Sequence, residues 1–113
     1  MGLDQYIHKN IKNEETGEWE QQEYHYWRKN NQIQGWFEEH YDQENCEETE
    51  ITVEVCDKII DDLKNEGLKP TSGFFYGKHV MEEEELENTI KLFENIKQEL
   101  EHEDCSFSYY CWY

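Results

Sequence analysis

The chain has 113 residues, of which 28 are acidic and 10 are basic, giving a formal net charge of -18 at pH 7. A surface with this charge repels nucleic acid and anionic membranes, which argues against direct binding of the protein to either. Hydrophobic residues make up 35% of the chain and aromatic residues 15%. Because each large ring buries about 150–250 Å², this composition predicts one folded domain over residues 1–113 with an aromatic-rich core.

The N-terminus and the cysteines indicate a compartment. No apolar run approaches the roughly 20 residues that a membrane-spanning helix needs, and MGLDQYIHKN lacks the basic start and apolar core of a signal peptide. The sequence therefore predicts a cytoplasmic protein that does not contact a membrane. Cysteines in that compartment are expected to be free thiols. Because no ligand spacing supports a zinc site, no metal is expected at Cys46, Cys56, Cys105 and Cys111.

The first part of the chain predicts a β-hairpin. Residues 3–11 (LDQYIHKNI) alternate in polarity and contain tyrosine and isoleucine, as half-buried strands do. Residues 13–17 (NEETG) have the composition of a turn. The segment EWEQQEYHYW follows and, being rich in rings, predicts a second strand that pairs with the first.

The segment YWRKNNQIQGWF at 26–37 places two basic residues among large rings. Over residues 28–42 the hydrophobic period becomes that of a helix. The residues that mark its apolar face are Ile33, Phe37 and Tyr41. A helix over 28–42 has Arg28 at its N-terminal end, where the helix dipole favours an anion.

The middle of the chain predicts a loop and a second helix. DQENCEETE at 42–50 predicts an acidic loop, and ITVEV at 51–55 predicts a short strand or the lead into a helix with Thr52 as N-cap. The helix ends before Gly67, and its apolar face consists of Val55, Ile59, Ile60 and Leu63. Residues 69–78 (KPTSGFFYGK) contain the only proline and predict a loop that runs into a short buried strand.

The glutamates at 82–85 open a third and longest predicted helix, because acids in the first turn complement the helix dipole. Its apolar stripe predicts core packing and consists of Leu86, Ile90, Phe93, Ile96 and Leu100. The last segment, CSFSYYCWY at 105–113, predicts a strand. Because both of its faces carry rings, we expect it to be covered on both sides.

These elements predict an α+β fold: a mainly antiparallel sheet that includes both terminal strands, with about three helices packed on it. The two terminal strands are expected to be neighbours, because an unpaired terminal strand would expose backbone donors and a row of aromatic side chains.

Sequence motifs for known catalytic chemistry are missing. GFFYGK at 73–78 has three residues between glycine and the GK pair where a P-loop has four, and His79 follows in place of serine or threonine. An enzyme is therefore the least favoured interpretation. A small nucleotide hydrolase could use His8, His25 or a pair of carboxylates, and no spacing selects among them. No cofactor is expected.

Polar and basic residues among the rings form the predicted ligand site. Rings stack on the base of a nucleotide-like ligand, and cations meet its phosphate oxygens. Arg28 and Asn31, three residues apart on one predicted helical face, are expected to contact the ligand together. The predicted ligand-binding residues are Tyr6, His8, Arg28, Lys29, Asn31, Gln34, Asn45, Thr71, Ser72 and Lys78.

The alternative for the same residues is structural. Trp27 and Trp36 are about two and a half helical turns apart, so both cannot stack on one ligand, and we expect Trp36 to belong to the core. Arg28 and Lys29 could simply neutralise acidic neighbours. Arg28 could then form an ordinary ion pair with Asp4 or with a glutamate of a loop.

The segments MGLDQY, YWRKNNQIQGWF, Asn45-Cys46, PTSGFFYG and the aromatic C-terminus resemble a family of small acidic bacteriophage proteins. Members open with a GLD-aromatic strand and carry YWRK-x-N-x-I-x-x-W, NC and T-x-GFF-x-G motifs in the same order along nearly the whole chain. Gln34 stands where the family has histidine, which weakens a general base at this position. The matching residues are Tyr26, Trp27, Arg28, Lys29, Asn31, Ile33, Trp36, Asn45, Cys46, Thr71, Gly73, Phe74, Phe75, Gly77 and Trp112.

The resemblance implies a phage accessory protein that acts against host defences in the host cytoplasm. The first hypothesis is a binding protein that sequesters a small nucleotide-derived ligand or immune signal in an aromatic and basic pocket. The second is an acidic DNA mimic that binds a basic host defence protein such as a nuclease, restriction enzyme or CRISPR effector. Either protein could form a homo-oligomer, and neither binds nucleic acid directly.

Overall fold

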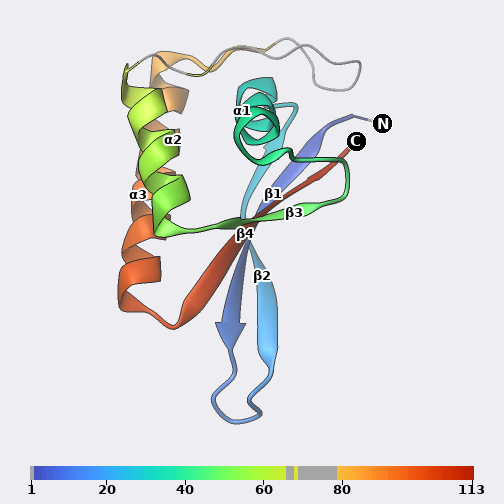
Figure 1. The fold of residues 1–113 in the computed structure, drawn as a ribbon, viewed down its shortest axis with the longest axis vertical. Helices are drawn as coiled ribbons and strands as arrows, with labels where there is room; N and C mark the ends of the chain where they lie inside the picture. Colours follow the sequence, from blue (N-terminus) through green and yellow to red (C-terminus); the bar gives the residue numbers. More distant parts are fainter. Residues whose placement is uncertain (1, 66–67, 69–78) are drawn as a thin grey trace.

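The computed structural model of the protein describes residues 2–65, 68 and 79–113. Within these residues, four strands and three helices follow one another in the order β-β-α-β-α-α-β (Figure 1). The elements are β1 (Asp4–Lys12), β2 (Trp19–Arg28), α1 (Asn31–Tyr41), β3 (Glu48–Ile51), α2 (Val53–Asn65), α3 (Glu83–His102) and β4 (Cys105–Trp112).

The four strands form one antiparallel sheet in the order β2-β1-β4-β3. The N-terminal strand β1 pairs with β2 on one side and with the C-terminal strand β4 on the other, so Ile7 lies between His25 and Tyr109. The predicted α+β fold and the predicted pairing of the terminal strands are therefore confirmed. The two strands at the centre of the sheet come from opposite ends of the chain.

The predicted turn between the first two strands is confirmed. The Asn13 side chain accepts hydrogen bonds from the backbone N–H groups of Glu15 and Thr16. Gly17 has φ of 73°, a left-handed conformation that glycine adopts without a steric cost. The hairpin of β1 and β2 extends beyond the helices at the bottom of Figure 1.

A β-bulge interrupts the pairing of β1 with β2. Ile7 lies opposite His25 and His8 lies opposite Glu23, which leaves Tyr24 as the extra residue. A bulge can turn two successive side chains to the same side of a sheet. Here the Tyr24 ring meets Phe107 edge to face at 4.9 Å, so Tyr24 and His25 both lie on the side that the helices cover.

The helices pack on one side of the sheet, which we call the covered face. Phe37 of α1 stacks on Tyr109 of β4 with ring centroids 4.0 Å apart and an angle of 2°. Trp27 of β2 stacks on Phe93 of α3 at 6.4 Å. Trp36 is 4% exposed and donates a hydrogen bond from Nε1 to Asp62 of α2, which confirms that it belongs to the core.

The other two helices begin where the sequence predicts. The Thr52 hydroxyl accepts a hydrogen bond from the Val55 backbone N–H at the start of α2. The first turn of α3 carries three glutamates, and Phe93 and Ile96 of its predicted stripe are fully buried. No helix in the described part of the chain is long and apolar enough to cross a membrane.

Helix α1 begins three residues later than the sequence predicts. Arg28 is the last residue of β2, and Lys29 adopts a left-handed conformation with φ of 55°. The Asn30 side chain then caps the helix by accepting a hydrogen bond from the Ile33 backbone N–H. Arg28 is therefore not at a helix N-terminus, and the prediction that a helix dipole assists it is wrong.

Two further expectations need correction. The predicted acidic loop at 42–50 contains the start of β3, which pairs with β4 from Glu48 to Ile51. The expectation that the last strand is covered on both sides is also wrong, because the helices pack on the side of Phe107 and Tyr109. Trp112 points to the opposite side and is 54% exposed. The strand predicted within 69–78 lies outside the described residues.

Candidate functional site

The structure separates the residues that the sequence assigns to one ligand pocket. Tyr6, His8 and Arg28 lie on the side of the sheet opposite the helices, as the strand pairing and the alternation of burial show. Asn31 and Gln34 belong to α1 and are buried. The predicted pair of Arg28 and Asn31 on one helical face is therefore wrong, since one ends a strand and the other begins a helix.

The buried amides of α1 have structural partners. Asn31 donates a hydrogen bond to the His79 carbonyl oxygen at 2.7 Å. Gln34 is fully buried, accepts a hydrogen bond from the Tyr109 hydroxyl at 2.7 Å and donates one to Glu38. A buried amide without partners would cost about 1–3 kcal/mol, so these contacts account for both side chains without a ligand.

A further buried amide anchors the junction between β2 and α1. Gln5 is fully buried in β1. Its side chain accepts a hydrogen bond from the Asn30 backbone N–H and donates to the Asn30 carbonyl oxygen and the Tyr109 hydroxyl. Gln5, Tyr109 and Gln34 thus form one continuous polar network that fixes the turn after Arg28.

The remaining predicted residues also lie apart. Lys29 donates its backbone N–H to the Leu3 carbonyl oxygen, and its side chain passes so close to Gly2 that a β-carbon there would lie 2.8 Å from Lys29 Cε. Asn45 exchanges two hydrogen bonds with the backbone of Tyr113. The predicted residues outside the described part of the chain are Thr71, Ser72 and Lys78.

The side of the sheet opposite the helices, which we call the open face, is the candidate functional site. It gathers alternate residues of all four strands, since pairs opposite one another in the register share a face. Its residues are Asp4, Tyr6, His8, Asn10, Lys12, Trp19, Gln21, Glu23, Tyr26, Arg28, Glu48, Glu50, Ser106, Ser108, Tyr110 and Trp112.

A cluster of four rings lies on the open face, near the end of the sheet that carries Asp4 and Trp112. Tyr6 lies at its centre, with ring centroids 5.2 Å from Tyr26, 6.2 Å from Tyr110 and 5.7 Å from His8. Trp112 lies opposite Asp4 in the register, next to this cluster. Tyr26 and Trp112 remain 42% and 54% exposed, so the cluster offers aromatic surface to another molecule.

Two carboxylates contact the ring cluster. Asp4 accepts a hydrogen bond from the Tyr26 hydroxyl, and Glu48 accepts one from Gln21 and contacts His8 Nδ1 at 3.2 Å. The hydrogen bond to Asp4 raises the pKa of Tyr26 above 10, which keeps the phenol protonated at neutral pH. The two carboxylates thus lie beside a platform of tyrosine rings.

The open face carries more acids than bases. Its basic residues are Lys12 and Arg28, and its acidic residues are Asp4, Glu23, Glu48 and Glu50. Arg28 lies opposite Asp4 in the register but forms no salt bridge with any residue in the described part of the chain. The ion pair that the sequence offered as the structural role of Arg28 is thus not made there.

Comparison of the chain with family models, with curated proteins and with solved structures finds no match. Stacked rings next to carboxylates are suited to cationic groups, because the ring face and the carboxylate both attract positive charge.

Sequence reasoning found three residues of the open face and missed the rest of it. The predicted site includes Tyr6, His8 and Arg28, whereas the sequence predicts that Tyr26, Tyr110 and Trp112 are strand or core rings. A signal is present in the alternation of 105–113, where Tyr110 and Trp112 place rings on the side opposite Phe107 and Tyr109. It could not distinguish an open face from a second buried one.

Proposed function

We propose that this protein is a non-catalytic binding protein that captures a basic segment of a partner protein on the open face. The observation that carries the proposal is the cluster of Tyr6, Tyr26 and Tyr110 beside the carboxylates of Asp4 and Glu48. Exposed rings alone would suit many ligands. Their combination with acids selects a cationic one.

Arginine fits this arrangement better than lysine. A guanidinium group is planar, so it stacks on a tyrosine ring while its N–H groups bond a neighbouring carboxylate. Tyr26 is partly exposed and hydrogen-bonds Asp4 directly, so a stacked guanidinium would lie within reach of that carboxylate. Stacking adds a preference for arginine that charge alone does not give.

The net charge of -18 supports the same class of partner. A strongly negative field raises the association rate of a positively charged protein and repels nucleic acid. The partner class is therefore a nucleic-acid-binding protein with a basic groove. Together with the resemblance to phage proteins, this supports a phage accessory protein that occupies the groove of a host nuclease, restriction enzyme or CRISPR effector.

Sequestration of a small anionic signal is the other function that the sequence predicts. It needs cations and rings at one site. In the described residues, Arg28 lies on the open face, whereas Lys29 lies against Gly2 and Asn31 is buried. Capture of a basic partner uses the charge of the protein, whereas capture of an anion has to overcome it.

Binding of a labelled oligoarginine peptide, followed by fluorescence anisotropy, tests the proposal. We expect binding at low salt that weakens as salt rises, and weaker binding of an oligolysine peptide of the same length. Tyr26→Ala should weaken oligoarginine binding by about fivefold or more, because it removes a stacking surface. Tyr41→Ala, which removes a ring of α1, should leave it unchanged.

Two variants with the same charge change separate a local site from the general field. Glu48→Gln removes a carboxylate of the open face, and Glu87→Gln removes an exposed one of α3. We expect a loss of about fivefold or more for Glu48→Gln and less than about twofold for Glu87→Gln, since distant exposed charges are screened. Equal losses for the two variants, or equal binding of both peptides, would show that the protein attracts cations only through its overall charge.

A further inference from the structure

A cavity of about 190 Å³ lies between β2 and α3, on the covered face and away from the ring cluster of the open face. Its lining includes His25 and Trp27 of β2, Met81 before α3, and Glu85, Asn88 and Leu92 of α3. Cavities for drug-sized ligands measure about 300–1,000 Å³. This one therefore accepts only a smaller group, about the size of one planar ring system.

The rings of the cavity are held in fixed positions. Trp27 stacks on Phe93 at 6.4 Å and meets His25 edge to face at 4.4 Å. The bulge at Tyr24 places His25 on the covered face. Met81 and Leu92 complete an apolar wall against which a flat ligand can pack.

Polar side chains at the cavity have hydrogen-bonding capacity to spare. His25, the Trp27 indole N–H and Asn88 make no hydrogen bond to any residue that the structure describes. Burial lowers the pKa of His25 below its ordinary value of 6.5, so its imidazole is neutral at neutral pH and offers one donor and one acceptor.

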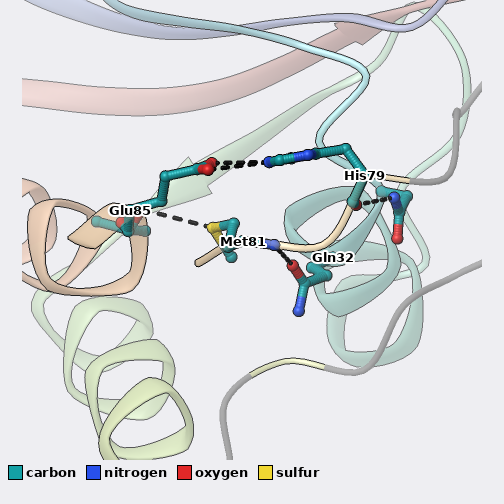
Figure 2. Close-up of polar contacts among 6 residues, drawn as sticks. Gln32, His79, Met81 and Glu85 are labelled. Carbon is teal, nitrogen blue, oxygen red and sulfur yellow. Dashed lines mark hydrogen bonds and ion pairs between the residues drawn. The ribbon is translucent and has the colours of Figure 1, made fainter. Parts of the chain in front are cut away.

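A pair of contacts fixes Glu85, the carboxylate among the described residues that line the cavity. His79 Nε2 lies 2.9 Å and 3.1 Å from the two oxygens of Glu85 (Figure 2). The same segment is tied to α1, because the Met81 backbone N–H donates to Gln32 and the His79 carbonyl oxygen accepts from Asn31. Glu85 is thus oriented, and its oxygens retain lone pairs for a further donor.

The charges of the cavity select against anions. No lysine or arginine is among the described residues that line it, and Glu85 is its acidic group. A ring with adjacent N–H donors can bond the carboxylate and pack on Trp27, whereas a phosphate would be repelled. Among nucleobases, guanine presents an N–H and an amino group side by side on one edge.

We propose that this cavity binds a neutral planar nitrogen heterocycle with adjacent N–H donors, of which guanosine is the test ligand, and that it discriminates against the phosphorylated form. Glu85 accepts the donors, Asn88 bonds the remaining polar edge and Trp27 supplies the packing surface. This site differs from the open face in position and in ligand, so neither proposal depends on the other.

Titration of the full-length protein with guanosine, observed through the indole N–H signals of its tryptophans, tests the proposal. We expect the Trp27 signal, assigned with Trp27→Phe, to shift in a saturable way. Guanosine 5′-monophosphate at low salt should bind at least about tenfold more weakly, because its phosphate adds negative charge beside Glu85. Uridine, with one ring and one N–H donor on its base, should also bind more weakly.

Matched variants on one helix complete the test. Asn88→Ala removes the amide at the cavity and should weaken guanosine binding at least about fivefold. Asn95→Ala removes an exposed amide two turns further along α3 and should leave binding unchanged. The proposal is overturned if millimolar guanosine leaves the Trp27 signal in place, if the monophosphate binds equally well, or if the two variants behave alike.

Discussion

The covered face and the open face are made by the same four strands, yet they are built on different principles. On the covered face Phe37 stacks on Tyr109 with both rings fully buried. The Tyr109 hydroxyl accepts a hydrogen bond from the Gln5 amide and donates one to the Gln34 amide. On the open face Tyr26 and Trp112 stay about half exposed beside carboxylates. One side has its partners within the chain, whereas the other presents groups that another molecule can bind.

This contrast separates residues that determine stability from residues that determine binding. Covered-face residues should change the free energy of unfolding when they are substituted, because they leave cavities or unpaired polar groups. Open-face residues should change binding with little change in stability, because their rings are only partly removed from water.

Removal of β4 should have the largest effect. Deletion of residues 105–113 takes out the strand that lies between β1 and β3 and exposes the backbone donors of both. We expect a chain without cooperative unfolding, as followed by circular dichroism on heating. Trp112→Ala, at an exposed position of the same strand, should melt within a few degrees of wild type. A truncated chain that melts cooperatively near the wild-type temperature would contradict the central place of β4.

A pair of ring deletions compares the two faces directly. Phe37→Ala should lower the free energy of unfolding by about 3–4 kcal/mol, because it leaves a cavity against Tyr109. Tyr26→Ala should lower it by less than about 1 kcal/mol, because its ring is 42% exposed. Urea denaturation measures both values. Similar losses for the two variants would mean that the open face is a second core.

Sequence alone could predict the elements but not the faces. Periodicity located the hairpin, α2 and α3, and it placed Phe107 and Tyr109 on one side of the last strand. It misplaced Arg28, because the cap at Asn30 ends the strand within a segment that otherwise has a helical period. Strand pairing and helix packing decide which face of the sheet buries its rings, and neither can be predicted from the periodicity of the sequence.

Long-range partners are the part of the site that the sequence does not show. Asn31 and Gln34 are predicted ligand-binding residues, and the structure adds the partners His79 and Tyr109, which lie 48 and 75 residues away in the chain. No local pattern reveals such a pair. The predicted ligand-binding roles of Thr71 and Lys78 fall outside the described residues and stay predictions.

An intermediate effect is expected at the edge of the covered face. Lys9 donates hydrogen bonds to Glu99 at 2.5 Å and Glu103 at 3.2 Å, and the Tyr24 hydroxyl donates to Glu99. Glu99→Gln should lower the free energy of unfolding by about 2 kcal/mol at neutral pH, because it removes charged hydrogen bonds of a part-buried group. Glu94→Gln, at an exposed position of α3, is the control.

The pH dependence of the Glu99→Gln effect follows from the pKa shifts. Burial opposes ionisation of Glu99, but the hydrogen bonds from Lys9 and Tyr24 outweigh it and hold the pKa below 4.5. Its contribution is therefore present above pH 4.5 and is lost as the pH falls through the folded-state pKa. The hydrogen bond to Glu99 raises the pKa of Lys9 above 10.5, so that contribution is present below pH 10.5 and is lost at higher pH. A gap between wild type and variant that stays constant from acid to neutral pH would contradict this account.

The smallest effect is expected at Ser108, in the middle of the open face. Its hydroxyl is buried and has no hydrogen-bond partner within the described part of the chain, so Ser108→Ala should be neutral or stabilise by up to about 1 kcal/mol. Ser106 is two residues away on the same face and accepts a hydrogen bond from Asn10 at 3.2 Å. Ser106→Ala should be mildly destabilising in the same urea denaturation experiment. The reverse order would show that Ser108 has a partner in solution.

The four tryptophans allow the most direct test of the central claim, that a basic partner binds the open face. Trp112 lies beside the ring cluster of that face, whereas Trp27 and Trp36 lie on the covered face and Trp19 lies at the far end of the hairpin, opposite Lys12. Each indole N–H gives its own signal in a proton–nitrogen spectrum. Titration with an oligoarginine peptide should shift the Trp112 signal strongly and in a saturable way, with no change at Trp27 or Trp36. Shifts at Trp27 or Trp36 with a stationary Trp112 signal would contradict the claim.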